Sequence, residues 1–279
     1  MENSEQFTPV DWQGVKKFLS GHSARHEINW TRETPSTQIL AKEAAKRGAP
    51  DGSVFVTDWQ NSGRGRRDRS WQSLPGMDLT FSVITRRRVA AKDAPLFSLA
   101  ASLAVCEALR IHLPESVSIK WPNDVLAGER KICGIICECA GAEYIDYAVT
   151  GIGINVNSRH EEPAPGDKKI PQKPAPTSLS TETGRSFGLP ELLALVLEEL
   201  DEACSLVESA QGRAALIESY KARCGTIGRA VTIVTDEGGL ECAAVGISDD
   251  GAIIVLDSSG KKRTFNAADV IHARLKDKT

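Results

Sequence analysis

Residues 63–71 read GRGRRDRSW and lie between two apolar runs with the character of β-strands, Ser53–Asp58 and Asp78–Thr85. Four of the nine residues are arginines and two are glycines. Arginine presents a planar fork of donors that suits carboxylate and phosphate oxygens, and glycine lets the backbone approach a ligand closely. Because such a loop repels itself unless an anion fills it, we expect it to close over a phosphate, a carboxylate or both. Composition alone leaves a solvated basic turn about equally open.

The composition narrows the class of protein. The chain has 279 residues, a net charge of -3 and a pI near 6.0, which argues against a general nucleic-acid binder and makes the arginines a local feature. Seven scattered cysteines favour reduced thiols. The polar segment Met1–Pro9 is unlike a signal peptide, and no apolar run approaches the roughly 20 residues that span a bilayer. We therefore expect a cytoplasmic protein without a membrane segment.

Hydrophobic periodicity up to residue 223 predicts alternating strands and helices. The expected strands are 28–32, 53–58, 78–85, 117–121, 131–139 and 144–156, the last two forming a hairpin across 140–142. The expected helices are 9–20, 38–47, 95–112, 190–208 and 212–223. The helix at 95–112 is apolar nearly all round, which is typical of a helix buried against a sheet. Residues 158–177 are rich in proline and charge and are predicted to form a surface loop.

The pattern of the sequence changes after Gly225. Four short alternating segments, 230–235, 240–247, 252–256 and 261–266, are separated by closely spaced glycine-containing turns. This pattern predicts a small all-β barrel of about 50 residues. We place a domain boundary near Thr226, between a first domain of residues 1–225 and a second of residues 226–279.

Two hydroxyl residues, Ser36 and Thr37, precede the helix expected at 38–47. Either is a natural N-cap, which offers a side-chain acceptor to the first amides of the helix. A helix N-terminus with hydroxyls can also bind a polar ligand group, and the two uses are compatible. The strand at 53–58 delivers Gln60 to the edge of the arginine loop.

A second polar group is Lys120-Trp121-Pro122-Asn123-Asp124. The lysine ends a strand, Pro122 directs the chain out of it, and Asn123 and Asp124 follow in a rigid turn where they can face a cleft. Alternatively, the segment simply forms a turn without a functional role, because Pro, Asn and Asp are common turn residues.

Two further strands carry unusual residues. Period 2 places Lys131 on one face with Cys133, Ile135 and Cys137, where its ammonium needs an anionic partner or an edge position. Gly134 removes a side chain from the opposite face, which indicates a close approach.

In the next strand Gly151, Gly153 and Asn155 share one face, while Ile152 and Ile154 share the other. Either the glycine face is open to a flat ligand that Asn155 can contact, or it packs tightly against another part of the protein. The chain has no Walker A loop, no spaced GxGxxG that opens a helix, no zinc spacing and no GxSxG elbow. The remaining repertoire of Arg, Lys, Asn and Asp suits phosphoryl or nucleotidyl transfer, in which positioning and electrostatics do most of the catalysis.

These blocks together, in their order and spacing, resemble those of biotin protein ligases. They are Ser36-Thr37, Gln60 with GRGRR at 63–67, Trp71, KWPND at 120–124, RKICGI at 130–135 and GIGIN at 151–155. The resemblance covers residues 28–157, and the small C-terminal barrel resembles the SH3-like domain of that family. It implies an α+β fold, with a mixed or antiparallel central sheet flanked by helices, like that of class II aminoacyl-tRNA synthetases.

The resemblance also implies a reaction in two steps. ATP activates biotin as biotinyl-5'-AMP with release of diphosphate, and a lysine of a biotin carboxyl carrier protein domain then attacks the mixed anhydride. The implied biotin-binding residues are Ser36, Thr37, Gln38, Gln60, Arg64, Gly65, Arg66, Lys131 and Gly134. The implied ATP-binding residues are Arg66, Arg67, Trp71, Lys120, Asn123, Lys131 and Asn155. The implied catalytic residues are Arg64, Arg66, Lys131, Lys120 and Asp124, the last as the base for the incoming lysine.

Cofactors and partners follow from the same resemblance. ATP and Mg²⁺ are the implied cofactors, and the resemblance leaves open a metal site near Asn155. Biotin and a carrier domain of a biotin-dependent carboxylase are the partners, without nucleic acid or membrane. Related ligases can form a homodimer through the central sheet. Only about 30 residues precede the first strand, which implies a ligase without a DNA-binding domain at its N-terminus.

The sequence departs from the family at two positions. Gln38 stands where the family commonly has Asn, which can alter one biotin contact, and Asp68 stands where it often has Gly. Two other functions stay open at this point: a lipoate ligase of the same broad fold, and a non-catalytic module that binds a nucleotide or nucleic acid.

Overall fold

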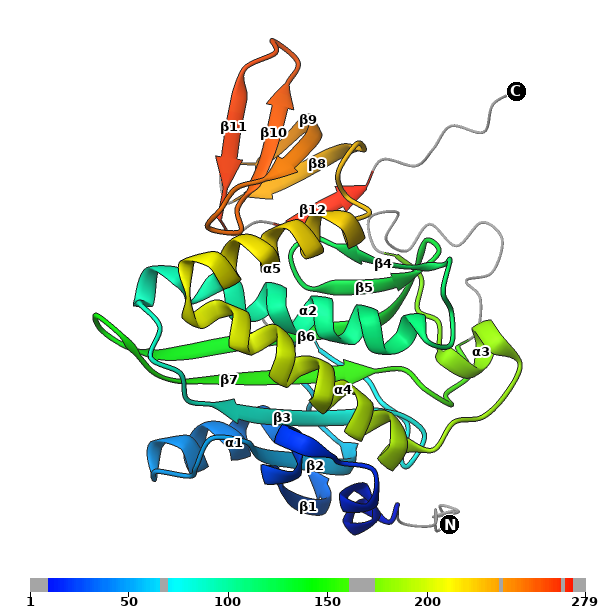
Figure 1. Ribbon diagram of the computed structural model, residues 1–279. Helices are drawn as coiled ribbons and strands as arrows, with labels where there is room; N and C mark the ends of the chain where they lie inside the picture. Colours follow the sequence, from blue (N-terminus) through cyan, green and yellow to red (C-terminus); the bar gives the residue numbers. More distant parts are fainter. Residues whose placement is uncertain (1–9, 66–69, 161–173, 236–237, 267–268, 273–279) are drawn as a thin grey trace.

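The computed structural model describes residues 10–65, 70–160, 174–235, 238–266 and 269–272. Two sheets organise the chain, with helices packed on the larger one and the smaller one above it (Figure 1). The predicted α+β architecture is confirmed. In this described part, no helix is both long and apolar enough to cross a membrane.

The larger sheet has seven strands in the order β1-β2-β3-β7-β6-β5-β4. Their bounds are β1 Glu27–Thr34, β2 Ser53–Gln60, β3 Leu79–Thr85, β4 Val117–Lys120, β5 Asp124–Ala127, β6 Arg130–Gly141 and β7 Ile145–Ile154. Only the β1–β2 pair is parallel in these ranges, so the sheet is mixed, as predicted. The hairpin of β6 and β7 is also confirmed. The sequence missed β5, because the turn chemistry of Pro122-Asn123-Asp124 hides a strand of four residues.

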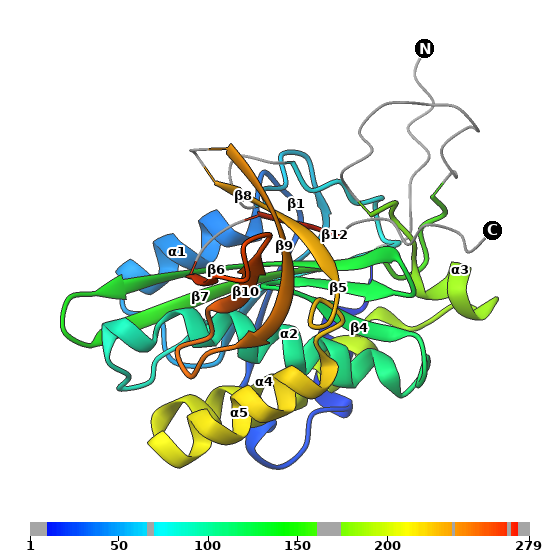
Figure 2. The same ribbon diagram turned by 90° about the horizontal axis from the view of Figure 1, so that it is seen from above.

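The helices lie on both faces of this sheet. They are α1 Thr37–Lys46, α2 Pro95–Arg110, α3 Leu179–Thr183, α4 Leu189–Ser205 and α5 Ala210–Arg223. Viewed from above, α1 lies on one side of the sheet and α2, α4 and α5 on the other (Figure 2). The helix α2 packs between α4 and strands β4–β7, and nearly all its side chains are buried, as its all-round apolar sequence predicts.

The short 3₁₀ segments are η1 Trp12–Lys17, η2 Gly21–Arg25, η3 Ala91–Asp93 and η4 Leu206–Glu208. The helix expected at 9–20 is thus a 3₁₀ segment of six residues that Asp11 caps by accepting from the amide of Gly14. Residues 161–173 of the loop expected at 158–177 lie outside the described residues. At its described end Pro176 is exposed, as predicted, whereas Thr177 is buried and its amide donates to the carbonyl of Lys131, because this segment extends the pairing of β6.

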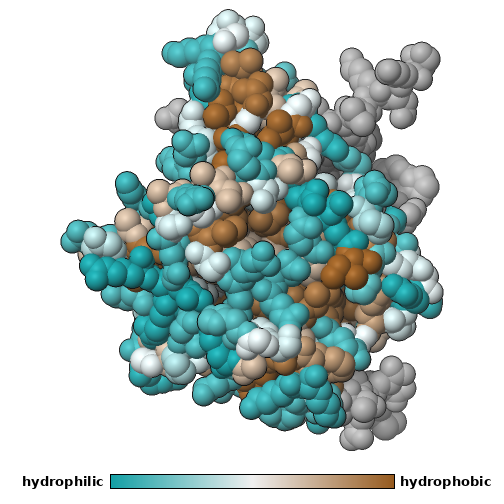
Figure 3. Space-filling view, viewed as in Figure 1, coloured by the Kyte–Doolittle hydropathy of each residue, from teal (hydrophilic) through white to brown (hydrophobic). Residues whose placement is uncertain are grey.

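The smaller sheet is antiparallel, with strand order β11-β10-β9-β8-β12. Its strands are β8 Ala230–Thr235, β9 Gly238–Ile247, β10 Ile253–Asp257, β11 Lys262–Phe265 and β12 Asp269–His272. Four of them match the predicted segments and the fifth, β12, was missed. Hydrophilic residues cover much of the helix-bearing face in Figure 3, and a hydrophobic strip runs over this small sheet.

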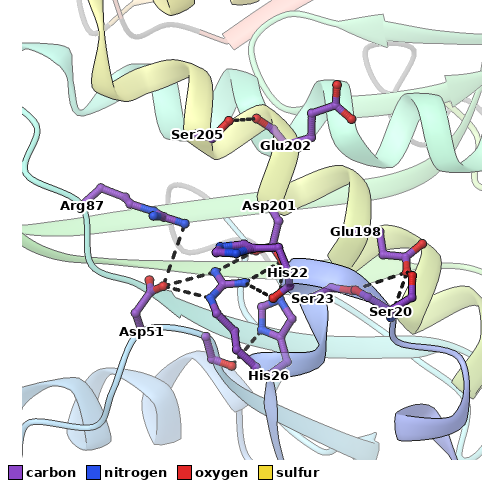
Figure 4. A network of polar contacts seen from close by, with 12 residues as sticks. Ser20, His22, Ser23, His26, Asp51, Arg87, Glu198, Asp201, Glu202 and Ser205 are labelled. Atoms are coloured by element: carbon purple, nitrogen blue, oxygen red, sulfur yellow. Dashed lines mark hydrogen bonds and ion pairs between the residues drawn. The ribbon is translucent and has the colours of Figure 1, made fainter.

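A network of ion pairs fixes the N-terminal segment to α4 and to the turn before β2 (Figure 4). Arg25 donates two hydrogen bonds to Asp201, at 2.6 and 2.8 Å, and also pairs with Asp51. The buried ring of His26 lies 3.0 Å from Asp201 through Nε2 and 2.8 Å from the carbonyl of Gly52 through Nδ1. Burial alone would raise the pKa of Asp201, but its bonds to His26 and Arg25 lower it to about 2.

We predict that Asp201→Asn lowers the free energy of unfolding by about 2 kcal/mol at pH 7, because each unit of pKa shift is worth about 1.4 kcal/mol. The folded pKa is depressed, so this stabilisation is present above the ordinary value of 3.8 and is lost as pH falls toward about 2. Urea unfolding at several pH values should therefore show the two proteins converging in acid. Glu218→Gln, which removes an exposed helix pair, is the control and should match the parent at every pH.

Candidate active site

A cavity of about 330 Å³ opens between α1, the larger sheet and the smaller sheet. Pockets of this size and above hold small molecules in proteins. Residues from many separate parts of the chain line it: Ser36, Thr37, Gln38, Gln60, Arg64, Gly65, Ser70, Trp71, Thr80, Phe81, Ser82, Lys120–Asp124, Lys131, Gly134–Ile136, Gly151–Gly153, Pro174, Val234, Val270 and Ile271. Most of the residues named from the sequence therefore meet at one place.

One end of the cavity carries a connected chain of polar groups. The amide of Thr37 donates to Oε1 of Gln60 at 2.8 Å, and the Thr37 hydroxyl lies 3.2 Å from the same oxygen. That hydroxyl also lies 2.9 Å from the hydroxyl of Ser82, which donates to Gln38. All four side chains are buried. The end can therefore present fixed donors and acceptors to a neutral polar group.

The predicted capping role of Ser36 differs in the structure. Ser36 occupies the N-cap position of α1, yet its side chain makes no capping bond within the described residues. The first amide of the helix is bonded instead by Gln60, which β2 brings from 23 residues away. Local sequence could not show this, because the acceptor belongs to another element.

Gln38 is held from behind by Glu138 of β6. Its Nε2 donates to Glu138 at 2.9 Å and to the carbonyl of Val149 at 3.0 Å, and Lys42 donates to the same carboxylate at 2.5 Å. Burial alone would raise the pKa of Glu138, but the bonds from Lys42 and Gln38 lower it. The carboxylate thus fixes the amide orientation of Gln38, a role that the sequence did not reveal.

The other end of the cavity is cationic. Lys131 donates to Oδ1 of Asp124 at 2.5 Å, and the buried Lys120 lies 3.9 Å from Oδ2 of the same carboxylate. In these contacts two ammonium groups share the carboxylate of Asp124. An anionic group of a ligand would be attracted to this end.

The face predicted for Lys131 is wrong. The pairing of β5 with β6 shifts register, so that Lys131 and Cys133 oppose the consecutive residues Leu126 and Val125. This irregularity breaks the period of 2: Cys133 is buried in the core, whereas Lys131 lines the cavity with its Nζ against Gly134. The ammonium obtains the anionic partner that it was expected to need.

Three glycines form the floor of the cavity, as the alternation of β6 and β7 predicts. A side chain at Gly153 would overlap the indole of Trp71, and one at Gly134 would lie 3.0 Å from the same ring. A side chain at Gly151 would lie 2.6 Å from the Gln38 amide oxygen. Glycine is therefore required at Gly153 and Gly151 for Trp71 and Gln38 to lie on the sheet.

Two hydrogen-bond donors of residues that line the cavity are not satisfied by other described protein groups. The buried Nε1 of Trp71 and the buried hydroxyl of Thr80 have no hydrogen-bond partner among the described residues. Buried polar groups are normally paired, so such atoms in a cavity are positioned for a ligand. The sequence did not single out Thr80, since a threonine inside an apolar strand carries no local signal.

The arginine loop is described at its two ends. Arg64 and Ser70 form a bridge, and the amide of Trp71 donates to the carbonyl of Gly63 at 2.8 Å. These contacts place the exposed Arg64 and Gly65 at the cavity. The predictions for Arg66 and Arg67, and the departure at Asp68, fall outside the described residues.

The two asparagines occupy different places. Asn123 lines the cavity and donates from Nδ2 to the carbonyl of Ile135. Asn155 donates from Nδ2 to the carbonyl of Thr177 and is buried there. Its amide therefore fixes the backbone beside Lys131. Asn155 is not among the residues that line the cavity, and its contact with ATP stays a prediction.

The smaller sheet contributes to the lining of the cavity, a role that the sequence left open. Val234 of β8 and Val270 and Ile271 of β12 line the cavity. Trp121 connects the two sheets: its backbone amide donates to the hydroxyl of Thr226 at 3.0 Å, and its indole donates to the carbonyl of Gly251 at 2.9 Å. The segment from Lys120 to Asp124 is therefore held from both sides.

A site with polar groups at one end, cations at the other and an apolar, glycine-floored middle suits a ligand that joins a neutral polar head to an anion through an apolar stem. Family comparisons agree with such a site. The model of the Biotin/lipoate A/B protein ligase family matches residues 30–155, and that of the Biotin protein ligase C terminal domain matches residues 226–273.

Individual relatives sharpen this result. The Biotin--[acetyl-CoA-carboxylase] ligase of Mycobacterium tuberculosis is 30% identical, over 95% of this chain and 97% of that protein. The Bifunctional ligase/repressor BirA of Bacillus subtilis is 32% identical, over 91% of this chain and 75% of that protein. The solved biotin protein ligase from Aquifex aeolicus in complex with biotin and ATP superposes with a TM-score of 0.72 at 27% identity, covering 89% of this chain and 99% of that one. The chain belongs to the biotin protein ligase family.

We predict that Gly153→Ala displaces Trp71 from the sheet, because the added Cβ would overlap its indole. Overpacking of this kind costs about 1–3 kcal/mol. Acrylamide should then quench the intrinsic fluorescence more strongly, since a displaced indole meets solvent. Gly246→Ala on β9 is the matched control, because its Cβ would meet only Ile254, at 3.9 Å. Equal quenching in both variants would contradict the packing of Trp71 on Gly153.

We also predict that Trp121→Phe lowers the free energy of unfolding by about 1–3 kcal/mol, since it leaves the buried carbonyl of Gly251 without its donor. Chemical denaturation measures the change. Trp30→Phe is the control: Trp30 is 43% exposed, and its acceptor, Oδ1 of Asp58, keeps the bond from Trp12. A Trp121 variant no less stable than the Trp30 variant would show that this bond contributes little.

Proposed function

We propose that this enzyme activates biotin with ATP and transfers the biotinyl group to a lysine of a biotin carboxyl carrier protein domain. The observation that carries the proposal is the division of one cavity into a neutral polar end and a cationic end. Biotin has the matching shape, with a polar ureido ring, an apolar middle and a terminal carboxylate. In the first step a carboxylate oxygen attacks the α-phosphorus of ATP, and diphosphate leaves.

The polar end is assigned to the ureido ring. Thr37, Gln60, Ser82 and Gln38 form one bonded chain there, so each can exchange or extend a bond toward the ring without reorganising the rest. Ser36 lines the same end. Gln38 is longer than the asparagine that the family commonly has, and its fixation by Glu138 draws the amide back toward β6.

The cationic end is assigned to the reacting groups. A carboxylate and a triphosphate repel each other, and the fixed cations Lys131, Lys120 and Arg64 offset that repulsion where they meet. Trp71, with its face on the glycine floor, is assigned to the adenine. We extend the same assignment to Arg66 and Arg67, which follow Arg64 and Gly65 directly in the sequence.

The second step needs a base for the incoming lysine. We assign it to Asp124, the carboxylate that the cavity offers between Lys120 and Lys131. Asp124 accepts a hydrogen bond from Lys131 at 2.5 Å, so it can take the proton of the incoming lysine once an anionic ligand engages that ammonium. The lysine nitrogen then attacks the carbonyl of the mixed anhydride, and AMP leaves.

We also propose Mg²⁺ as a cofactor that arrives with ATP. Among the described residues no group of three or more acidic, histidine or cysteine side chains is arranged to hold a metal ion. Mg²⁺ usually binds through one or two carboxylates together with substrate phosphates and water. Asp124 is the residue that would supply such a carboxylate, and the ion would neutralise phosphate charge there.

Other features stay predictions. The boundary between residues 225 and 226 is proposed on the start of the small sheet at Ala230 and on the match of the second family model at residue 226. The homodimer, the absence of a nucleic-acid partner and the cytoplasmic location rest on the sequence and on the resemblance.

One assay tests the acid that is activated. ATP–diphosphate exchange should depend on biotin and not on lipoate, and an apo carrier domain should then gain the mass of one biotinyl group. Exchange that depends on lipoate alone would overturn biotin as the substrate. Exchange with neither acid would overturn the adenylation step.

We predict that Lys131→Ala lowers the rate of biotin-dependent exchange by about 10²- to 10³-fold, the range found when one fixed donor to a transition-state charge is removed. Its fold should persist, because Lys131 is partly exposed and its main packing is against the cavity. Circular dichroism checks this. Lys221→Ala on α5, whose ammonium pairs with exposed Glu218, is the matched control and should exchange like the parent.

A further inference from the structure

The buried polar chain at one end of the cavity has hydrogen bonds whose directions can be assigned one by one. It joins Gln60, Thr37, Ser82 and Gln38, and the carboxylate of Glu138 lies behind Gln38. A hydroxyl has one proton to donate, and a side-chain amide donates only from its nitrogen. The direction of each bond therefore fixes the direction of the next.

The assignment starts at Glu138. Burial acts to raise the pKa of this carboxyl group, but the bonds from Lys42 and Gln38 lower it, so at neutral pH the group is ionised and can only accept. The second group beside the Gln38 amide is the carbonyl of Val149, which also only accepts. The nitrogen of Gln38 therefore faces these two acceptors and commits both its protons to them. Its oxygen is left to face Ser82, at 3.1 Å.

The same direction passes from Ser82 to Thr37. The single hydroxyl proton of Ser82 is donated to Gln38, so toward Thr37, 2.9 Å away, Ser82 can only accept. On the other side, Gln60 presents its Oε1 to Thr37, because that atom accepts the backbone amide of Thr37 at 2.8 Å. The Thr37 hydroxyl thus has one proton for two acceptors, and neither of them donates to its oxygen.

The glycine floor and Glu138 hold this arrangement in place. A Cβ on Gly151 would lie 2.6 Å from Oε1 of Gln38 and 3.2 Å from the hydroxyl oxygen of Ser82, so both atoms lie directly over that glycine. Turning the Gln38 amide over would bring its oxygen against Glu138 and the Val149 carbonyl with no proton between them. Such unmade bonds between buried polar groups are costly. The carboxylate of Glu138 therefore opposes reversal of the whole chain.

We propose that Glu138 is a positioning residue, which fixes the direction of this hydrogen-bond chain so that the Thr37 hydroxyl accepts an N–H group of the ligand. This inference rests on the proposed function, which places a cyclic urea with two N–H donors at this end. In a reversed chain Ser82 would donate to Thr37 and occupy one of its lone pairs, which weakens that contact. The direction of the chain in the free protein does not depend on the proposed function.

The first experiment measures the dissociation constant for biotin with the full chain, by isothermal titration calorimetry. Glu138→Gln keeps the size of the side chain, but Gln38 then meets a group that donates as well as accepts. We expect the dissociation constant to rise about 3- to 10-fold, the effect of one hydrogen bond between neutral groups. Glu43→Gln on α1 is the matched control, because its exposed carboxylate lies 3.9 Å from Arg47, and it should bind biotin like the parent.

A double-mutant cycle tests whether Glu138 acts through the chain. Ser82→Ala interrupts the chain between Gln38 and Thr37. In that background Glu138→Gln should change the affinity for biotin by less than about twofold, because the direction no longer reaches Thr37. Equal losses in the two backgrounds would show a merely structural role for Glu138 and overturn the proposal. A Glu138→Gln variant that binds biotin as tightly as the parent would overturn it as well.

Analogues of biotin test which ligand group is recognised. In the two cyclic carbamates related to biotin, an ether oxygen replaces one ring N–H or the other. One of them should bind the parent less tightly than biotin does, and that loss should shrink in Glu138→Gln, where the acceptor at Thr37 is already weakened. Losses that are the same in parent and variant for both carbamates would contradict the assigned role of Thr37.

A spectroscopic measurement reads the direction in the parent without ligand, and it does not require Glu138→Gln to fold. We expect a scalar coupling across the hydrogen bond between Nε2 of Gln38 and the carbonyl carbon of Val149. Its absence, in a spectrum that shows the backbone couplings between β6 and β7, would overturn the assigned direction. A parent that shows this coupling but does not bind biotin would count against the proposed function alone.

Discussion

The antiparallel pairing of β6 with β7 is the constraint on which the site depends. It sets Gly134 directly opposite Gly153, and Gly151 opposite Ile136, so that one face of the sheet centre is almost free of side chains. The indole of Trp71 lies on that floor, and the amide of Gln38 reaches across it. The other face of the same strands carries Ile152 and Ile154, which pack into the core beneath α2. A single register thus supplies both the cavity and the hydrophobic support below it.

Different interactions organise the two ends of the cavity: hydrogen bonds between neutral groups at one end and contacts between charged groups at the other. At one end, neutral groups satisfy each other in a buried chain from Gln60 to Gln38, and the charge of Glu138 is kept behind it by Lys42. At the other end, the ammonium groups of Lys131 and Lys120 lie around the carboxylate of Asp124 and can attract an anion. Buried polar chains are stable when fully paired. The two ends of the cavity therefore favour different chemical groups.

The smaller sheet takes part in the same arrangement. The backbone amide of Trp121 donates to the hydroxyl of Thr226, and its indole donates to the carbonyl of Gly251. The segment that carries Lys120 and Asp124 is therefore fixed by residues on both sides of the domain boundary. Tyr220 of α5 adds a bond to the carbonyl of Pro122 at 3.1 Å. The lining by Val234 and Val270 gives this sheet a direct place at the cavity. It thus closes the site as well as packing against it.

The sequence by itself determined most strands and helices, the small all-β unit, and the side-chain-free face at Gly151 and Gly153, because periodicity and glycine placement are local properties. The order of the charged blocks was enough to indicate the family. Only the tertiary structure decided that Lys131 faces the cavity, because the irregular pairing that turns it depends on β5, a strand hidden by turn residues. The cap of α1 by Gln60 and the lining by Val270 likewise join residues far apart in the chain. Local patterns record which way a residue alternates, whereas register and contacts between distant elements are fixed only when the whole chain packs.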